Sequence, residues 1–109
     1  MTTATIILEQ LGGNKFIVMT GSHHLVADGD TLRMQLRRNR SGANRLFITL
    51  DKGTDTYTMR FFYYRPGRID IKNGRSIKEV EREITQYAGA HTEDLCRIFE
   101  NVTGLATHL

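Results

Sequence analysis

Hydrophobic and polar residues alternate most regularly over residues 45–65, and this alternation predicts two strands joined by a polar turn at residues 51–54. The first set of alternate positions in the second strand is apolar enough to face a core. The other set places an arginine beside aromatic rings, which a fully solvated face does not need. The first set is Tyr57, Met59, Phe61 and Tyr63, and the other is Thr58, Arg60, Phe62 and Tyr64.

The residues before this hairpin predict both helix and strand. Residues 3–11 carry apolar side chains on one helical face and end at a glycine pair, so we expect a helix, with a strand as the competing interpretation. Residues 15–20 contain four apolar residues in a row with β-branched members, which predicts a buried strand. Residues 22–30 are expected to form a loop or an irregular edge, because Asp28 and Gly29 are turn formers.

Turn-forming residues separate the next predicted strands. Residues 31–37 alternate between apolar and polar side chains, and the polar loop at residues 38–44 joins them to the central hairpin. Pro66 ends the second hairpin strand, because proline cannot donate a hydrogen bond to a ladder. A short strand is expected at residues 68–72, closed by a turn that begins at Asn73.

Residues 76–88 fit two structures. Apolar residues recur three or four positions apart, which predicts one face of a helix, and Ser76 with Glu79 would form a capping box. Charges also alternate along this segment, as they would on a strand at the edge of a sheet. The helix is the preferred interpretation, and the strand stays open. The apolar residues concerned are Ile77, Val80, Ile84 and Tyr87.

The last element is predicted to be a helix between a capping Thr92 and a terminating Gly104. Its apolar stripe consists of Leu95, Ile98, Phe99 and Val102. Together the elements predict one small α+β domain over residues 1–109. We expect four or five mostly antiparallel strands, with the C-terminal helix packed on one face and a short N-terminal helix beside it if residues 3–11 are helical.

Several totals limit the class of protein. At 109 residues the chain is long enough for one modest core. The single cysteine, Cys96, has no partner for an intrachain disulfide, and no apolar run approaches the roughly 20 residues that span a bilayer. The first residues lack the pattern of a secretory signal, so we expect a protein of the reducing cytoplasm that does not bind membranes.

Charge is unevenly distributed along the chain. Residues 31–78 carry twelve Lys or Arg and three acids, a net charge of +9, whereas residues 1–30 carry −2 and residues 79–109 carry −4. This segregation predicts a basic sheet that meets a polyanion or a protein with an acidic surface. The alternative is that the basic and acidic parts neutralise one another within the fold.

The candidate binding residues are basic and aromatic. Arginine neutralises phosphates, and exposed aromatic rings stack on unpaired bases, which predicts a nucleic-acid surface on the sheet and its turns. The alternative is that the C-terminal helix covers the rings and the arginines are ordinary solvated residues. The candidates are Arg33, Arg37, Arg38, Arg40, Arg45, Arg60, Phe62, Tyr64, Arg65, Arg68, Lys72 and Arg75.

No catalytic or metal centre is expected. His23 and His24 are adjacent and would point to opposite faces of a strand, so they do not suit one metal ion. The Asp pairs occur in predicted turns, where aspartate is expected for backbone reasons, and the glycine runs lack the lysine of a phosphate loop. We therefore expect a non-enzymatic protein without a cofactor.

Three stretches resemble short proteins of bacteriophages and prophages: LEQLGGNKFIVMTG at residues 8–21, DTYTMRFF at 55–62 and IFENVTGLATHL at 98–109. The resemblance covers most of the chain in order and implies a viral or mobile-element origin, not a particular chemistry. It directs attention to accessory binding roles. The first is binding of DNA or RNA, and the second is inhibition of a host nucleic-acid-handling complex by protein binding, as anti-CRISPR proteins do. The third is assembly into oligomers through an exposed strand edge.

Overall fold

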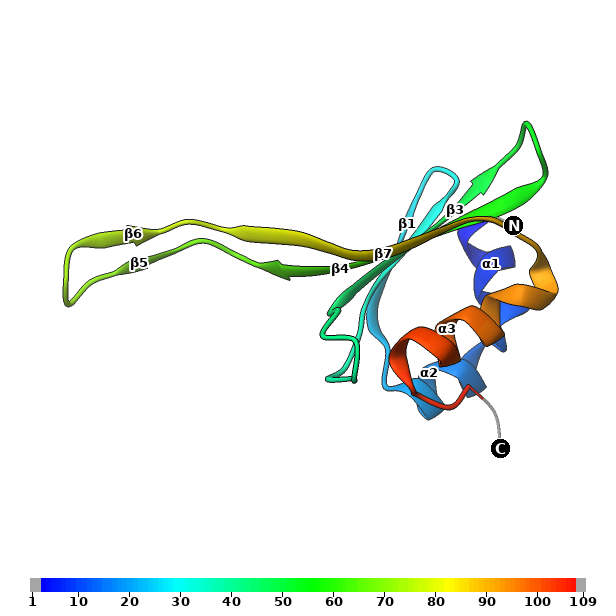
Figure 1. Ribbon diagram of the computed structural model, residues 1–109, viewed down its shortest axis with the longest axis horizontal. Coiled ribbons are helices and arrows are strands. Elements are labelled where there is room, and N and C mark those ends of the chain that lie inside the picture. Colours follow the sequence, from blue (N-terminus) through cyan, green and yellow to red (C-terminus); the bar gives the residue numbers. More distant parts are fainter. Residues whose placement is uncertain (1–2, 108–109) are drawn as a thin grey trace.

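The computed structural model describes residues 3–107, and within them it has an α+β fold, as predicted. An antiparallel sheet of order β1-β2-β3-β4-β7 carries three α-helices on one face, and a second sheet pairs β5 with β6 (Figure 1). The elements are α1 (Thr3–Leu11), α2 (Asn14–Thr20), β1 (His23–Asp28), β2 (Thr31–Gln35), β3 (Arg45–Asp51), β4 (Thr56–Arg65), β5 (Arg68–Asp70), β6 (Arg75–Ile77), β7 (Val80–Ala90), the 3₁₀ turn η1 (Thr92–Asp94) and α3 (Leu95–Thr103).

The core lies between the sheet and the helices. Opposite residues of an antiparallel pair point to the same face, so the register Leu32 to Ile48 to Met59 forms one buried row across β2, β3 and β4. Phe99 of α3 packs edge-to-face on Phe16 of α2, with ring centroids 5.0 Å apart. Phe61 of β4 lies 6.5 Å from Phe99, so phenylalanines of α2, α3 and β4 join both helices to the sheet.

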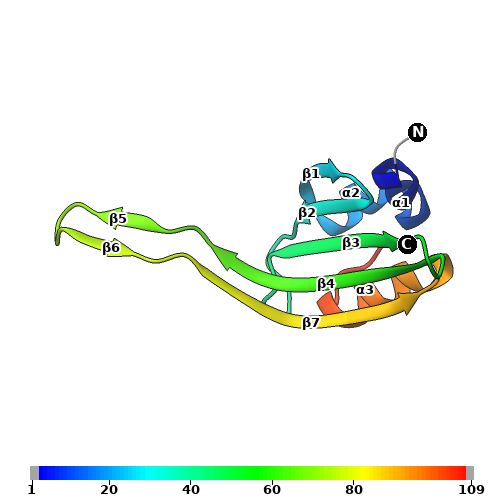
Figure 2. The same ribbon diagram turned by 90° about the horizontal axis from the view of Figure 1, so that it is seen from above.

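A two-stranded arm projects from this body. The ladder between β4 and β7 ends where Arg65 pairs with Val80, and β5 and β6 continue the ribbon outward to a turn at residues 71–74. Figure 2 shows β5 and β6 far beyond the helices and the other strands. The arm, defined here as residues 65–79, accounts for the elongated shape of 50 × 33 × 24 Å.

The prediction of a strand at residues 15–20 was wrong. Residues 14–20 form helix α2, which buries only Phe16 and Thr20, one turn apart, and leaves Val18 79% exposed. The Thr20 hydroxyl donates to the Phe16 carbonyl at 2.7 Å. Of the two interpretations of residues 22–30, the irregular edge is confirmed: they contain the edge strand β1, with a register shift between His23 and Val26.

The preferred helix at residues 76–88 was also wrong. Residues 80–90 form strand β7, which pairs with β4 from Arg65 against Val80 to Tyr57 against Ala90. This pairing satisfies backbone groups of β4 that would otherwise form an open edge. The helices predicted at residues 3–11 and near the C-terminus are confirmed, and Gly104 ends α3 with φ of 75°.

Candidate functional site

The sheet face opposite the helices collects arginines and aromatic rings. One row of the ladder runs from Arg33 through Phe47 to Arg60, and the next runs from Arg45 to Phe62. Because facing residues share a side of the sheet, β2, β3 and β4 bring these side chains together. We call this the open-face cluster, and its members are Arg33, Arg45, Phe47, Arg60, Phe62 and Tyr64.

Each ring of the open-face cluster lies near a guanidinium group. Arg33 Cζ lies 4.9 Å from the Phe47 centroid, and Arg60 Cζ lies 6.0 Å from the Phe62 centroid. Phe47 and Phe62 also meet edge-to-face at 4.7 Å. As a result Phe62 is only 5% exposed, although the helices do not cover it. A base could stack on Phe62 only after the neighbouring side chains moved aside.

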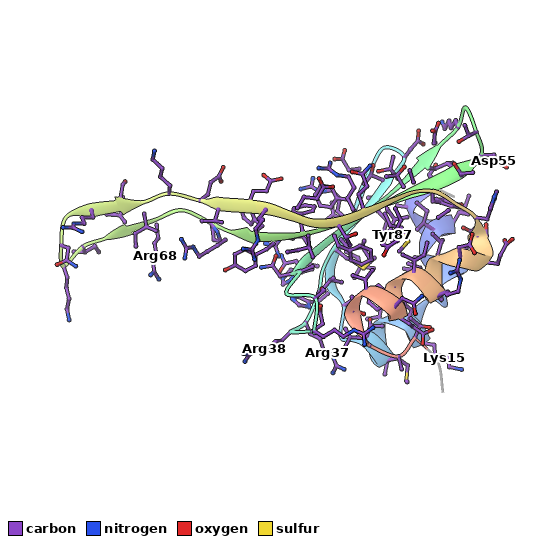
Figure 3. All side chains as sticks on the ribbon, in the orientation of Figure 1. Lys15, Arg37, Arg38, Asp55, Arg68 and Tyr87 are labelled. Atoms are coloured by element: carbon purple, nitrogen blue, oxygen red, sulfur yellow. The ribbon has the colours of Figure 1, made fainter. Side chains whose placement is uncertain are left out.

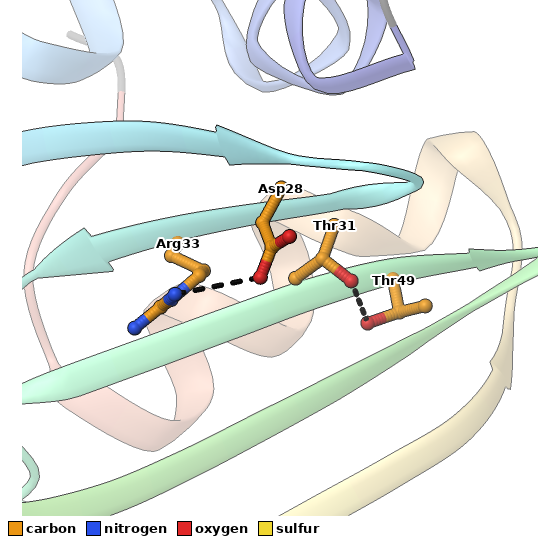
Figure 4. Close-up of polar contacts among 4 residues, drawn as sticks. All are labelled: Asp28, Thr31, Arg33 and Thr49. Carbon is orange, nitrogen blue, oxygen red and sulfur yellow. Dashed lines mark hydrogen bonds and ion pairs between the residues drawn. The ribbon is translucent and has the colours of Figure 1, made fainter.

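Carboxylates neutralise much of the positive charge on this face. Asp28 Oδ2 lies 3.4 Å from Arg33 Nη1, and Figure 4 shows this pair beside the hydroxyl contact of Thr31 with Thr49. Glu83 Oε1 lies 3.4 Å from Arg60 Nε. Glu81 lines the same shallow hollow of about 660 Å³ as Arg33 and Arg45. A polyanion on this face would therefore compete with acids already in place.

Tyr64 fixes the point where the arm leaves the body. Its hydroxyl donates to Glu79 Oε2 at 3.1 Å, and this hydrogen bond to a carboxylate is the main reason that the pKa of Tyr64 is raised. The Asn44 side chain donates to the Tyr64 carbonyl at 2.7 Å and accepts from the Tyr64 N–H at 2.8 Å. Sequence reasoning missed Asn44 and Glu79 as the residues that hold the base of the arm. An asparagine directly before a predicted strand was the available signal.

Two of the candidate arginines lie at helix ends. Arg37 packs on the C-cap of α2, where a Cβ atom on Gly21 would lie 2.7 Å from Arg37 Cδ. The Arg40 guanidinium donates to the Asn101 carbonyl in the last turn of α3. Cations are favourable at the negative end of a helix dipole, so the Arg40 guanidinium has a structural role at the end of α3, while the aliphatic part of Arg37 packs on the end of α2. Arg38 is exposed in the same loop, and Figure 3 shows Arg37 and Arg38 far from Arg68.

The arm holds the remaining candidates and exposes them. Within residues 65–79 there are five basic residues and two acids. The side chain of Ile69 is 74% exposed and that of Ile71 is 92% exposed. Lys78 belongs to the same charged segment, although the sequence-based list omitted it. The five basic residues are Arg65, Arg68, Lys72, Arg75 and Lys78, and all are exposed.

The structure therefore divides the predicted surface into three places. Arg33, Arg45, Arg60, Phe62 and Tyr64 meet on the sheet. The arginines at positions 37, 38 and 40 lie in the β2–β3 loop, and those at positions 65, 68 and 75 lie with Lys72 on the arm. The arm combines five exposed basic residues with two acids, of which Asp70 stands opposite Arg75 in the ladder.

The other reactive side chains show no grouping. Among residues 3–107, no group of three or more His, Cys, Asp or Glu could hold a metal ion. The rings of His23 and His24 pack edge-to-face at 5.0 Å. The Cys96 thiol donates to the Leu11 carbonyl at 3.2 Å, and burial raises its pKa, so little thiolate forms near neutral pH.

Comparisons with known proteins do not add to this site. The chain matches no protein-family model, no curated protein and no solved structure. None of the helices formed by residues 3–107 is long and apolar enough to cross a membrane. The function must therefore be argued from the arm and the open-face cluster themselves.

Proposed function

We propose that this protein is a non-enzymatic binder of double-stranded nucleic acid, and that the arm makes the principal contact. The observation that carries the proposal is the excess of exposed basic residues on the arm, five against two acids. One of those acids, Glu79, accepts the Tyr64 hydroxyl at the base. Lysine and arginine bind phosphates and release counterions, which supplies most of the sequence-independent affinity for a duplex.

The shape of the arm favours a duplex over a single strand. From Arg65 to its turn the ribbon spans roughly 25 Å at about 3.3 Å per residue, most of one turn of a double helix. Its two strands lie about 5 Å apart, so side chains on both can reach phosphates on either side of a groove. Single-strand binders instead use exposed aromatic rings, whereas residues 65–79 contain none and Phe62 is 5% exposed.

The alternative of docking on a host protein through acidic residues has less support. Glu83 contacts Arg60, and Glu79 holds Tyr64 at the base of the arm. These carboxylates therefore serve contacts within the protein and do not form a free row that could imitate phosphates. The proposed setting, the cytoplasm of a bacterial host of a phage, follows from the resemblance described above.

The test compares two double variants that each remove two positive charges. Arg68→Ala with Arg75→Ala changes the arm, and Arg33→Ala with Arg60→Ala changes the open-face cluster. Fluorescence anisotropy with labelled duplexes and single strands of DNA and RNA, titrated with salt, measures both. We expect the arm variant to lose about 50-fold in duplex affinity near 0.1 M salt and about 1.8 units of salt slope. The sheet variant should lose less than about threefold, because acids already compensate its arginines.

Two results would contradict the proposal. The first is undetectable binding of the unchanged protein to any duplex at low salt. The second is an equal loss of affinity in both variants, which would assign the effect to net charge rather than to the arm. Thermal unfolding of each variant checks that the body remains folded.

A further inference from the structure

The turn at the end of the arm presents an isoleucine to solvent. Ladder pairing in the arm ends with Asp70 opposite Arg75, so residues 71–74 form the turn, at the end farthest from the body (Figure 2). Ile71 is the first residue of that turn and is 92% exposed. Gly74 takes a φ of 62°, which lets the chain reverse directly after the tip.

Further apolar side chains lie next to Ile71. Ile69 is 74% exposed, and Ile77 stands opposite Arg68 in the ladder. A shallow hollow of about 410 Å³ is lined by both of them together with Ile71, Arg68 and Lys72. Apolar surface of this kind is unfavourable in water unless a partner covers it. Because an arginine and a lysine border the hollow, we expect the partner to carry anionic groups next to an apolar surface of its own.

A base-pair step of a duplex has both properties. We infer that Ile71 inserts as a wedge between two base pairs from the minor groove and kinks the DNA, while Arg68 and Arg75 contact the flanking phosphates. Isoleucine is among the side chains that unstack base steps in this way, and the kink lets the duplex wrap more protein surface. This inference rests on the proposed function, because it adds an unstacking step to binding of the duplex by the arm.

The distribution of charge favours a groove over a membrane surface. An anionic bilayer would contact the tip alone, whereas basic residues continue along the arm from Lys72 back to Arg65 and Lys78. Segments that enter a membrane interface commonly carry Trp or Phe among their apolar residues, and residues 65–79 contain no aromatic side chain. A groove can meet the whole length of the ribbon.

The experiment measures binding and bending together. A duplex of about 30 base pairs with a donor and an acceptor dye at its two ends reports bending by energy transfer. A second duplex of the same sequence carries a central mismatch, which lowers the cost of unstacking. The unchanged protein is compared with Ile71→Ala and with Val18→Ala, which shortens an exposed apolar side chain on α2, outside the arm.

The unchanged protein and the Val18→Ala variant should raise energy transfer on the intact duplex and bind the mismatched duplex about tenfold more tightly. Ile71→Ala should still bind, through the basic residues, but its preference for the mismatch should fall below about twofold and the bending signal should be lost. This pattern would assign the unstacking step to the tip.

Each other outcome overturns the inference in a different way. Binding of the intact duplex without bending, or equal bending by Ile71→Ala, removes the wedge and leaves the proposed function in place. Undetectable binding to either duplex removes both. Binding to vesicles that contain anionic lipids, lost in Ile71→Ala and without any bending of DNA, would assign the tip to a membrane surface.

Discussion

The arm and the open-face cluster contain similar residues, arginines beside apolar side chains, but they differ in how far the apolar side chains are exposed. On the sheet, Arg33 and Arg60 have carboxylate partners at 3.4 Å, and Phe62 is 5% exposed. On the arm, Ile71 is 92% exposed and basic residues outnumber acids by five to two. Residues of similar type are therefore packed together on the sheet and exposed to solvent on the arm.

The two regions also differ in what stabilises them. The body buries phenylalanines from α2, β4 and α3 against one another. The arm is a ribbon of two strands with no layer packed on it, and such hairpins are marginally stable by themselves (Figure 1). Local opening of the arm should therefore cost much less free energy than global unfolding.

The largest expected effect is on binding, after removal of the arm. Replacing residues 66–79 by Asn-Gly would join Arg65 to Val80, which already face each other in the ladder, through a two-residue hairpin turn. The variant loses four basic residues, so we expect duplex affinity to fall at least about 10³-fold and the salt slope to lose about 3.6 units. Anisotropy titrations measure both quantities.

The same variant tests whether the arm and the body are energetically separate. Its melting temperature should stay within about 4 °C of that of the unchanged protein, equivalent to about 1 kcal/mol for a domain of this size. A much larger decrease would show that the arm contributes to the stability of the body. If duplex affinity survives removal of the arm, the open-face cluster becomes the principal candidate for the duplex-binding surface.

A second prediction contrasts one residue from each region. Phe99 is fully buried against Phe16, so Phe99→Ala should cost about 3–5 kcal/mol of unfolding free energy. Ile71→Ala removes an exposed side chain and should change stability by less than about 0.5 kcal/mol. Urea denaturation followed by circular dichroism measures both, and Phe99→Leu serves if Phe99→Ala does not fold. A large loss in Ile71→Ala would mean that the tip packs on the body.

The elements with a clear local pattern were the ones that the sequence predicted well. The alternation in residues 45–65 correctly predicted β3 and β4, and the apolar stripe that includes Leu95 and Phe99 correctly predicted α3. Helix α2 was mistaken for a strand because its apolar run is too short for periodicity to distinguish the two. A helix was preferred over strand β7 because local spacing cannot show the pairing with β4, in which Tyr57 and its partner Ala90 are 33 residues apart in the chain.

The sequence predicted the residue types of the candidate site. It did not predict that these residues are divided among the sheet, the β2–β3 loop and the arm. A charge count along the chain finds the basic segment, but it cannot show that Arg60 meets Glu83 across β4 and β7, or that Arg40 reaches α3. Both contacts join residues far apart in sequence. The exposure of Ile71 was equally hidden, because alternation with Ile69 resembles that of any half-buried strand.

The smallest expected effect comes from removing one acid on the sheet. Glu83→Gln would break the contact with Arg60, in which both side chains are nearly half exposed, and such pairs contribute about 0–1 kcal/mol. If only the arm meets the duplex, affinity should change by less than about twofold, a small gain from net charge. The matched control is Glu93→Gln, which removes the same charge from η1, the turn that directly precedes α3.

The comparison of these two variants isolates the open-face cluster. Equal small changes in duplex affinity would mean that freeing Arg60 creates no phosphate contact, as expected. A gain of about eightfold near 0.1 M salt for Glu83→Gln alone, with a salt slope steeper by about 0.9, would mean that Arg60 then touches a phosphate. In that case the duplex lies across the sheet as well as along the arm, and the carboxylates of β7 limit its affinity.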